Sequence, residues 1–391
     1  MTPAVAGEAP ARTTITGIRS HVVGAGWRNF VYVEIETAAG VVGLGEASLE
    51  GQTGGVLGAI DDLRALFVGA DPWRIEHLWQ QAYRHAFWRG GPAYLSALSG
   101  LETALWDIKG QMLGVPIHRM FGGRVRDKAR VYANGPRGET PAEVARHARE
   151  LVDRGYTALK WAAFPATPIM GGRRYIDAGI AQVQAVREAV GPDVDLMIDA
   201  HGRLSPAAAV RAAQALEPYR ILFFEEPVLP ENVPAMARVA AKTSIPIATG
   251  ERLLTRFGFR ETLEARACSV VQPDLAHAGG LSETRKIAAM AEMYMCAIAP
   301  HNPLSWVNTV ASLHVDISAP NFLIQEVVTD PQPWMDDVVD WRPELLAGGF
   351  MNIGDRPGLG IALRHEALSR WPAVSVRMPA LWHEDGSVAD W

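Results

Sequence analysis

Three stretches of the sequence share one pattern: DLMIDAHG (195–202), ILFFEEP (221–227) and IPIATGER (245–252). Each contains a short apolar run typical of a buried strand, and each run ends in an acid. The intervals from Asp199 to Glu225 and from Glu225 to Glu251 are both 26 residues. One strand and one helix fit into each interval, which is the repeat of a barrel of parallel β/α units.

The same alternation of apolar runs and amphipathic helices extends in both directions from these stretches. It begins near Val131 and stops after about residue 328. Eight candidate strands can be distinguished, the number that closes such a barrel: RVYANG, TALKWA, DLMIDA, ILFFEEP, IPIATGE, SVVQPD, MCAIAPH and FLIQE. We therefore predict an α/β fold with a TIM-type (β/α) barrel over residues 126–327.

The sequence before the barrel follows a different pattern. Two or three strands between Thr14 and Glu46 are followed by helical patterns at about 53–67, 73–86 and 92–113. Together they predict an α+β capping domain over 13–125. Residues 1–12 are predicted to form a disordered tail, and the Pro- and Trp-rich segment 328–391 is predicted to return to the cap.

Composition excludes several classes of protein. The chain has 391 residues, 48% of them hydrophobic and 20% charged, with a net charge of −6. It therefore lacks the basic field that attracts nucleic acid or anionic membranes, and we expect neither as a partner. No apolar run approaches the roughly 18 residues of a membrane span. The N-terminus lacks a secretory pattern and Cys268 and Cys296 lie within apolar runs, so a cytoplasmic location is expected.

The three strand-end acids form a candidate metal site. Barrel enzymes carry their chemistry at the carboxyl ends of the strands, so Asp199, Glu225 and Glu251 are expected to converge at the barrel mouth. Three carboxylate oxygens suit Mg²⁺, which keeps its other positions for water or substrate. The alternative is that each acid caps the helix that follows it. Three acids in equal register favour the metal site.

The following strands also end in polar residues, namely Asp274, His301 and Glu326. Asp274 and His301 lie on neighbouring strands, where a carboxylate can fix the tautomer of an imidazole and raise its basicity. His301 is thus a candidate general base. Without its partner, it would equally fit a residue at the start of the next helix.

Two further residues are candidates on the early barrel strands. His201 follows Asp199 by two residues, so the strand's period of two predicts that both side chains face the metal. Strands three and seven are opposite in an eight-stranded barrel, which places His201 and His301 on two sides of a substrate and suits acid–base catalysis. Lys160, on strand two, is either a substrate contact or a solvated strand-end lysine.

The ordered set MIDAHG, FFEEPV, ATGERL, QPDLAHAGG, APHNPL and IQE resembles the mandelate racemase subgroup of the enolase superfamily. Within that subgroup it is most similar to the D-galactonate dehydratases. The similarity extends to WRGGP at 88–92, LWDIKG at 105–110, PGLG at 357–360 and LWHEDGSVADW at 381–391. It therefore spans both the cap and the barrel.

The resemblance implies a role for each matching residue. Asp199, Glu225 and Glu251 would bind Mg²⁺, and Glu226 would not be a ligand. His301 with Asp274 would be the base, His201 the general acid, and Glu326 a partner of the enolate oxygen. These roles agree with the general chemistry of enolase-type sites, which pair a Lys or His base with Mg²⁺. The resemblance also implies a homo-oligomer, an octamer in this family.

The implied reaction is a hydro-lyase reaction on a small acid sugar. The C2 proton is removed, the C3 hydroxyl leaves, and a 2-keto-3-deoxy acid results. We expect D-galactonate as the substrate, with D-gluconate or a pentonate as the alternative. Trp27 and Glu50, in cap loops, are expected to line the distal hydroxyls.

Two departures from the family pattern bear on this expectation. The racemases' K-x-K has become Lys160-Trp161-Ala162, so the second lysine base is missing and racemisation or epimerisation is disfavoured. The loop 164–177 does not match the galactonate enzymes, which leaves the substrate within the acid sugars open. A binding protein on a retired enzyme scaffold is disfavoured, because the expected ligands and base dyad are all present.

Overall fold

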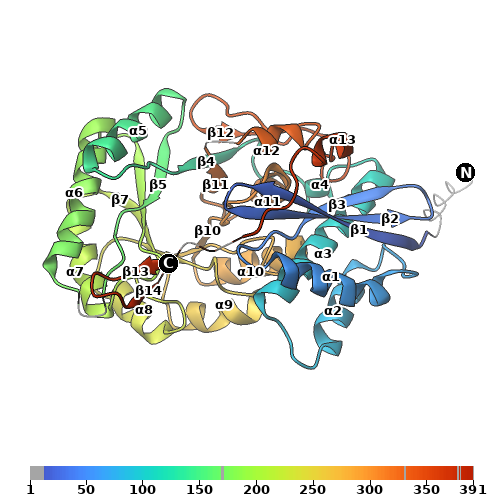
Figure 1. Cartoon of the computed structure of the whole chain (residues 1–391), viewed down its shortest axis with the longest axis horizontal. Helices are drawn as coiled ribbons and strands as arrows, with labels where there is room; N and C mark the ends of the chain where they lie inside the picture. The colour runs from blue at the N-terminus through green and yellow to red at the C-terminus, as the bar shows by residue number, and fades with distance from the viewer. Residues whose placement is uncertain (1–12, 169–170, 330–331, 377, 379, 391) are drawn as a thin grey trace, which may run out of the picture.

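The computed structural model describes residues 13–390, apart from 169–170, 330–331, 377 and 379. The tail predicted at 1–12 lies outside the described residues. Figure 1 shows the chain as two parts, an N-terminal sheet with its helices (blue) and a ring of strands and helices (green to orange). The predicted fold class, a (β/α) barrel with an α+β cap, is confirmed.

The cap is a three-stranded antiparallel sheet packed against helices. Its strands, in the spatial order β1-β2-β3, are β1 (Ile15–Ala25), β2 (Arg28–Thr37) and β3 (Val42–Glu46). Its helices are α1 (Thr53–Phe67), α2 (Ile75–His85) and α3 (Pro92–Leu113). Because side chains alternate along a strand, Val31 and Val33 pack against the helices while Phe30 and Tyr32 join the core shared with the barrel. The sheet thus connects the two parts of the molecule.

The barrel consists of eight parallel strands in the order β10-β9-β8-β7-β6-β5-β4-β11. They are β4 (Ala129–Asn134), β5 (Ala158–Ala162), β6 (Asp195–Asp199), β7 (Ile221–Glu225), β8 (Ile247–Thr249), β9 (Val270–Val271), β10 (Ala297–Ile298) and β11 (Gln325–Val328). The ring closes where Ile298 N–H donates to Asn321 O at 3.0 Å and Leu323 N–H donates to Ile298 O at 2.9 Å.

One helix follows each of the first seven barrel strands. They are α5 (Pro141–Asp153), α6 (Arg173–Val190), α7 (Pro206–Leu216), α8 (Val233–Ala240), α9 (Thr255–Glu264), α10 (Gly280–Met293) and α11 (Trp306–Ser318). The start of α5 shows how sequence sets these boundaries. Thr140 Oγ1 accepts from Glu143 N–H at 3.3 Å while the Glu143 carboxylate accepts from Thr140 N–H at 3.0 Å, a reciprocal cap.

The inside of the barrel is filled by one buried apolar residue from each strand or its immediate flank: Tyr132, Ala158, Met197, Phe223, Ala248, Val270, Ala299 and Ile324. We call these eight residues the barrel plug. The residues two positions further along each strand point to the same side. They are Asn134, Lys160, Asp199, Glu225, Gly250, Gln272, His301 and Glu326. Each strand thus passes from an apolar layer to a mostly polar layer within two residues, and the polar layer forms the candidate site.

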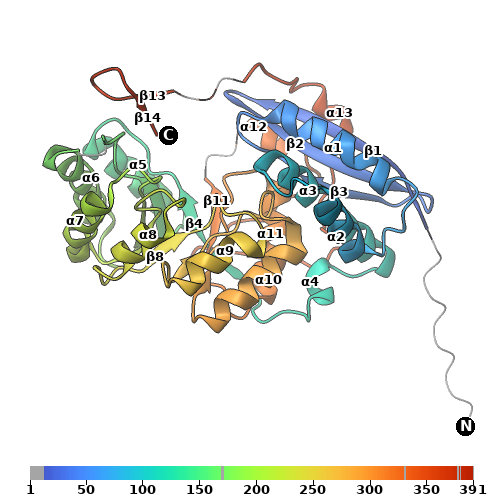
Figure 2. The same cartoon turned by 90° about the horizontal axis from the view of Figure 1, so that it is seen from below.

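The C-terminal segment divides between the two parts of the molecule. α12 (Pro333–Asp337) and α13 (His365–Leu368) lie beside the cap sheet (Figure 1), and β12 (Phe350–Met351) pairs antiparallel with β4. Gly24 N–H donates to Trp371 O at 3.0 Å. The final hairpin, β13 (Leu381–Trp382) and β14 (Val388–Ala389), lies instead on the barrel side, as Figure 2 shows.

Candidate active site

The strand-end layer opens into a cavity of about 870 Å³ between the barrel mouth and the cap. Its walls contain residues from both parts of the chain. Asp199, Glu251, His201, His301, Lys160 and Glu326 come from the barrel, and Trp27 and Glu50 from the cap loops. The structure therefore brings together at one cavity residues that lie up to about 300 positions apart in sequence.

The three expected metal ligands converge beside this cavity, which Asp199 and Glu251 line. Asp199 and Glu225 are the last residues of β6 and β7, and Glu251 follows β8 by two residues. One carboxylate oxygen from each lies within 4.8 Å of the other two. Asp199 and Glu225 are buried and Glu251 is half-buried. Two of the three carboxylates are thus shielded from solvent. Their attraction for a cation is therefore screened less than it would be at the surface.

Glu251 stands one residue beyond the strand-end layer because Gly250 occupies the place of a side chain there. Gly250 has a φ of +144°, which favours glycine. A Cβ at this position would lie 2.7 Å from a ring carbon of Phe259 and 2.8 Å from the backbone nitrogen of Gln272. The glycine allows the close approach of β8 to its neighbours, and the next residue supplies the carboxylate.

Lys160 lies in the middle of the acid cluster and is buried. Its Nζ is 2.7 and 2.9 Å from the two oxygens of Glu225, and 3.3 Å from Glu326 Oε1. Burial alone would lower the pKa of Lys160, but the surrounding carboxylates, Glu225 first, raise it well above its ordinary value. The alternative of a solvated strand-end lysine is therefore wrong.

The electrostatics of the cluster reflect crowding of like charges. Burial, followed by the negative charge of Asp199, raises the pKa of Glu225 well above its ordinary value, against the opposing charge of Lys160. Burial also raises the pKa of Asp199, but the charge and hydrogen bonds of His201 and the charge of Lys160 more than offset it and hold it below its ordinary range. A divalent cation would relieve this repulsion, and three converging carboxylate oxygens are the donor set that hard cations prefer. The residues fit a divalent metal.

His301 and Asp274 form a hydrogen-bonded pair. His301 Nδ1 lies 2.8 Å from Asp274 Oδ2, and Asp274 Oδ1 accepts from Ala276 N–H at 2.8 Å. His301 Nε2 faces Glu251 Oε2 at 3.3 Å. Burial lowers the pKa of His301, but Glu251, Glu326 and Asp274 raise it to about 10. The Nδ1 contact fixes the ring so that Nε2 is directed to the acid cluster.

Glu326 lies between the dyad and the lysine. Its Oε1 accepts from Asn134 Nδ2 at 2.6 Å and its Oε2 accepts from Asn302 N–H at 2.9 Å. Its Oε2 is also 4.0 Å from His301 Nε2. These fixed donors hold the carboxylate at the inner wall of the cavity, at the strand end where it was expected.

His201 reaches the cavity by a route that strand periodicity does not predict. β6 ends at Asp199, and His201 lies in the following turn with a φ of 49°, in the left-handed region. The period of two along a strand therefore does not apply to it. The side chain still turns toward the acids: its Nε2 lies 3.1 Å from Asp199 Oδ2, and the charge of Asp199 raises the pKa of His201.

The cap residues Trp27 and Glu50 both line the cavity, as does Arg28, whose guanidinium lies 5.2 Å from the centre of the Trp27 ring. The Arg28 guanidinium donates to the Glu50 carboxylate and to the carbonyl oxygen of Pro303, two residues after His301. Sequence reasoning missed Arg28, because a contact between cap and barrel leaves no local pattern. It directly joins the cap loops to the strand end that carries His301.

Sequence reasoning also passed over two residues of the strand-end layer. Gln272 Nε2 donates to Glu225 Oε2 at 2.6 Å, and Asn134 Nδ2 donates to Glu326. Both could have been found by counting two residues on from the apolar residue of each strand. Glu226, the second acid of the pair, turns away from the cluster to Arg252 and Thr249, whose Oγ1 donates to it at 3.1 Å. It does not share the three-carboxylate site.

Comparison with known families agrees with the two-part architecture. Residues 143–367 match the family described as Enolase C-terminal domain-like, and residues 9–122 match the mandelate racemase / muconate lactonizing enzyme N-terminal domain. The chain belongs to the enolase superfamily. Within the superfamily it falls into the mandelate racemase subgroup, and it is an enzyme of a group that is typically dependent on a divalent metal.

The similarity to known proteins covers almost the whole length of this enolase superfamily member. A D-galactonate dehydratase of Ralstonia nicotianae is 42% identical over 93% of this chain and 96% of its own. One of Variovorax paradoxus is 40% identical over 96% of this chain and 100% of its own. The solved mandelate racemase/muconate lactonizing enzyme from Jannaschia sp. CCS1 is 34% identical with a TM-score of 0.87, covering 93% of this chain and 99% of its own.

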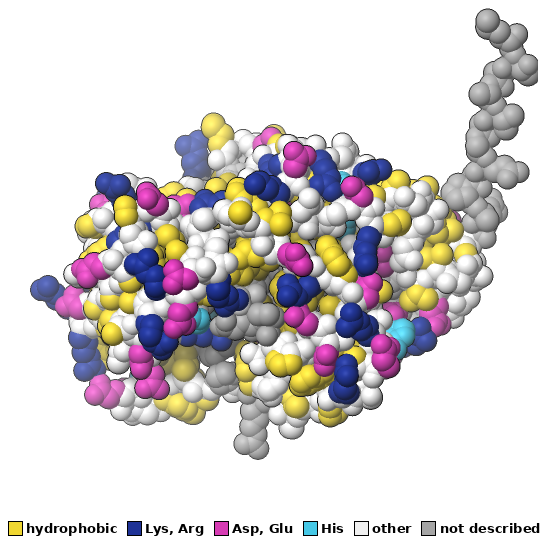
Figure 3. Space-filling view, turned by 90° about the horizontal axis from the view of Figure 1, so that it is seen from above, with side chains coloured by type: hydrophobic (Ala, Val, Ile, Leu, Met, Phe, Trp, Pro, Cys, Tyr) yellow, Lys and Arg dark blue, Asp and Glu magenta, His cyan; other side chains and the backbone are white. Residues whose placement is uncertain are grey.

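One face of the surface and the lengths of the helices bear on the choice of partners. Figure 3 shows acidic and basic side chains interspersed over one face, without a field of a single sign. In the part of the chain that the structure describes, none of the helices is both long and apolar enough to cross a membrane.

Proposed function

We propose that this enzyme dehydrates D-galactonate to the 2-keto-3-deoxy acid. The observation that carries the proposal is the position of His201 and His301 at the ends of the third and seventh of eight barrel strands, either side of the carboxylate cluster. Support for the substrate comes from relatives about 40% identical over most of the chain that are D-galactonate dehydratases.

His301 is the base in this proposal. Its Nδ1 is held by Asp274, so Nε2 is the ring nitrogen that accepts the C2 proton as a C2 carbanion-like centre forms. The charge of Glu251 raises the pKa of His301, and a cation bound to Glu251 would offset that charge and favour the unprotonated ring that a base requires. Glu326, held by Asn134 and Asn302, would lie beside the substrate carboxylate that becomes an enolate. Once the C2–H bond breaks, its electron pair forms the C2–C3 double bond as the C3 hydroxyl leaves.

His201 is the general acid. Hydroxide is a poor leaving group, so the C3 oxygen must receive a proton as the C3–O bond breaks. The charge of Asp199 raises the pKa of His201, which favours the protonated imidazole that a general acid requires. Water departs, and the resulting enol takes a proton at C3 to become the ketone, so the net change is the loss of one water.

Asp199, Glu225 and Glu251 would hold Mg²⁺. The ion would offset the second negative charge that develops on the substrate carboxylate when the C2 proton leaves. Lys160 lies beside Glu225 and Glu326, where its ammonium can attract the same carboxylate. Trp27 and Glu50, on the opposite wall, would contact the distal hydroxyls.

Epimerisation on the same fold needs a second base on the other face of C2. The position on β5 two residues after Lys160 is Ala162, which has no acid–base chemistry and lines the cavity. Lys160 itself is engaged with two carboxylates. These observations favour dehydration over racemisation.

The test is a turnover screen over acid sugars with excess Mg²⁺, with 2-keto acids detected as semicarbazones. D-Galactonate should give the highest kcat/KM, followed by D-gluconate and pentonates. Turnover restricted to aromatic or dicarboxylic acids would contradict the proposed substrate class. Full activity in excess EDTA would contradict the metal requirement, and Glu225→Gln, which keeps the shape of the side chain, should lose turnover while remaining folded.

We also propose that the enzyme acts in the cytoplasm as a homo-oligomer. Cys268 and Cys296 are both free thiols and buried, which suits a reducing compartment. Phe87 and Trp88 are 85% and 87% exposed side by side in the cap, an unusual arrangement for a monomer's surface. Light scattering of the purified protein should give a mass of at least twice the 42.4 kDa of one chain, and a monomer would contradict this proposal.

A further inference from the structure

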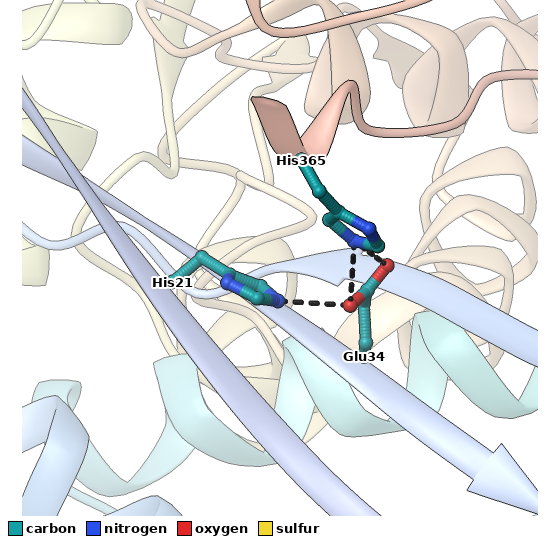
Figure 4. A group of neighbouring side chains, drawn as sticks. All are labelled: His21, Glu34 and His365. Carbon is teal, nitrogen blue, oxygen red and sulfur yellow. Dashed lines mark hydrogen bonds and ion pairs between the residues drawn. The ribbon is translucent and has the colours of Figure 1, made fainter. Parts of the chain in front are cut away.

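A second cluster of metal-ligating side chains lies in the cap, away from the barrel mouth. Figure 4 shows His21, Glu34 and His365 with both imidazole rings directed at one carboxylate. His21 Nε2 lies 2.8 Å from Glu34 Oε2, and His365 Nε2 lies 2.9 and 3.1 Å from the two carboxylate oxygens. One ligand atom from each residue lies within 4.8 Å of the other two.

The three residues come from three separate elements. In the antiparallel register, His21 of β1 is opposite Tyr32 of β2, so Glu34 is its diagonal neighbour on the same face. That face is turned from the cap helices toward the C-terminal segment, and α13 brings His365 over it. The cluster thus joins residues 13 and 331 positions apart in sequence.

The cluster has the chemistry and the access of a cation site. Glu34 and His365 line a groove of about 530 Å³, so ions and water can enter. The side chain of Glu34 is only 6% exposed, while those of His21 and His365 are 22% and 53% exposed. We propose that His21, Glu34 and His365 bind a late first-row divalent cation, Zn²⁺ in particular, with water from the groove as the remaining ligand.

The donor atoms separate this site from the one in the barrel. Two imidazole nitrogens and one carboxylate oxygen suit Zn²⁺, whereas three carboxylates suit Mg²⁺. Tetrahedral Zn²⁺ with bonds of about 2.0–2.1 Å requires its ligand atoms to be about 3.3 Å apart. The histidine–carboxylate contacts of 2.8–3.1 Å need to widen by a few tenths of an ångström. The two imidazole nitrogens, which lie within 4.8 Å of each other, need to reach the same separation. His365 is on a four-residue helix at the surface, where such a shift is easily made.

The guanidinium of Arg19 also forms an ion pair with Glu34. Its Nη2 lies 3.4 Å from Glu34 Oε2 but 3.0 Å from Glu36 Oε1, and the side chain is about half exposed. Zn²⁺ binding would leave Arg19 paired with Glu36 alone. An exposed pair of this kind contributes little to stability, so its rearrangement opposes metal binding only weakly.

A cation at this position would fasten α13 to the cap sheet. β1 continues from His21 to the turn that carries Trp27, and β2 begins directly after it with Arg28; both residues lie at the cavity wall. The C-terminal segment beyond α13 is bound next to that loop, since Gly24 N–H donates to Trp371 O and Asn29 Nδ2 donates to Val374 O at 2.9 Å. The site therefore braces the wall of the active-site cavity without contributing to the chemistry.

The test is a zinc titration of the full chain in excess Mg²⁺, in competition with a chromophoric chelator and without substrate. The wild type and Glu225→Gln should each bind one equivalent of Zn²⁺. His21→Gln and His365→Gln should bind it at least ~100-fold more weakly, because even loss of an outer-sphere partner costs 10–100-fold. The matched control is His77→Gln, an exposed cap histidine outside the cluster, which should behave as the wild type.

Two results would overturn the proposal. One is unchanged zinc affinity in His21→Gln and His365→Gln, and the other is loss of zinc binding in Glu225→Gln, which would place the ion in the barrel. Zinc-edge anomalous scattering from wild-type crystals gives a reading that needs no variant, with a peak expected between the three side chains. Because no substrate is used, the outcome is independent of whether the proposed dehydration is correct.

Discussion

Asn308 holds Asp274 from the side that faces the cap. Its Nδ2 lies 3.4 Å from Asp274 Oδ1 and 3.0 Å from Asn302 Oδ1, while its backbone N–H donates to Glu46 Oε2 at 3.1 Å. Glu46, the last residue of β3, is buried and also accepts from Ser305 and Ser48. A chain of hydrogen bonds thus runs from the cap sheet to the carboxylate that orients the proposed base.

This chain predicts that Asn308→Ala lowers kcat by about tenfold with little change in KM, the size of effect expected for an outer partner of a catalytic group. Asp274→Asn should cost more, since it removes the contact to His301 itself. Steady-state kinetics with D-galactonate measure both. Asn352→Ala, an exposed asparagine far from the dyad, is the control. A rise in KM that is larger than the fall in kcat would show that Asn308 acts on substrate binding instead.

An isotope-exchange experiment should distinguish the roles of His301 and His201. His301→Asn should abolish dehydration and exchange of the C2 hydrogen with solvent deuterium, each by about 10³-fold or more. His201→Asn should block dehydration but still permit exchange, because His301 can remove and return the proton. Proton NMR of the substrate in D₂O follows the C2 signal. Exchange that survives in His301→Asn and stops in His201→Asn would reverse the assigned roles.

Lys160 should stabilise the protein most when metal is absent. Lys160→Met leaves the buried carboxylates of Glu225 and Glu326 without their cation, and breaking a buried pair in this way costs about 3–5 kcal/mol. Thermal unfolding in EDTA should show a large loss of Tm, and excess Mg²⁺ should restore part of it. A Tm deficit of the same size with and without Mg²⁺ would indicate that Lys160 acts independently of the metal site.

The stability of the chain should fall with acid below about pH 6.5 because of two buried histidines. Burial lowers the pKa of His118 from 6.5 to about 4 and that of His314 to about 3. Their Nδ1 atoms lie 3.3 Å apart, so a charge on one ring would disfavour a charge on the other. The Leu359 carbonyl, 3.1 Å from His314 Nε2, raises the pKa of His314 but does not offset burial. The unfolded chain then binds more protons than the native chain below pH 6.5, and stability decreases as pH falls.

The slope should be about 1.4 kcal/mol per pH unit for each histidine, levelling off as pH passes below the folded-state values near 4 and 3. Urea unfolding at a series of pH values measures it. His314→Gln should remove the share of one histidine, while His77→Gln, at an exposed position, should leave the slope unchanged. An identical slope in His314→Gln and wild type would assign the acid sensitivity to other groups.

Arg28 should matter for substrate binding, since it joins Glu50 to the backbone at Pro303. Arg28→Ala leaves Glu50 without its partner in the cavity wall and frees the cap loop from the strand end. We expect KM for D-galactonate to rise about tenfold, equivalent to about 1.4 kcal/mol. Arg89→Ala, at an exposed cap position, should have no effect. An increase confined to aromatic acids would indicate a different substrate.

The barrel and most of its strand-end chemistry could be predicted because the relevant signals are local. Each buried strand is an apolar run that ends in a polar residue, so Asp199, Glu225 and Glu251 were visible from their spacing alone. The environment of the Lys160 side chain could not be predicted in this way. Whether it is solvated or buried depends on Glu225 and Glu326, which lie 65 and 166 residues further along the chain.

Other features depend on how the two parts of the chain meet. Arg28 contacts Pro303 across 275 residues, and His21 meets His365 across a still longer interval. No periodicity within either segment encodes such a contact. The left-handed turn at His201 was also hidden, because the backbone changes direction within two residues of the strand end. Sequence patterns specify elements well and the interfaces between them poorly.

The barrel plug has a kinetic consequence. Its eight side chains are all at most 3% exposed, so they close the barrel interior beneath the cavity. In the part of the chain that the structure describes, the substrate and the dehydrated acid therefore cannot pass through the barrel interior, and both must enter and leave on the side of the cavity away from the plug. Since both would occupy the same carboxylate-binding end of the cavity, the keto acid should act as a competitive inhibitor, and accumulating product should slow its own formation.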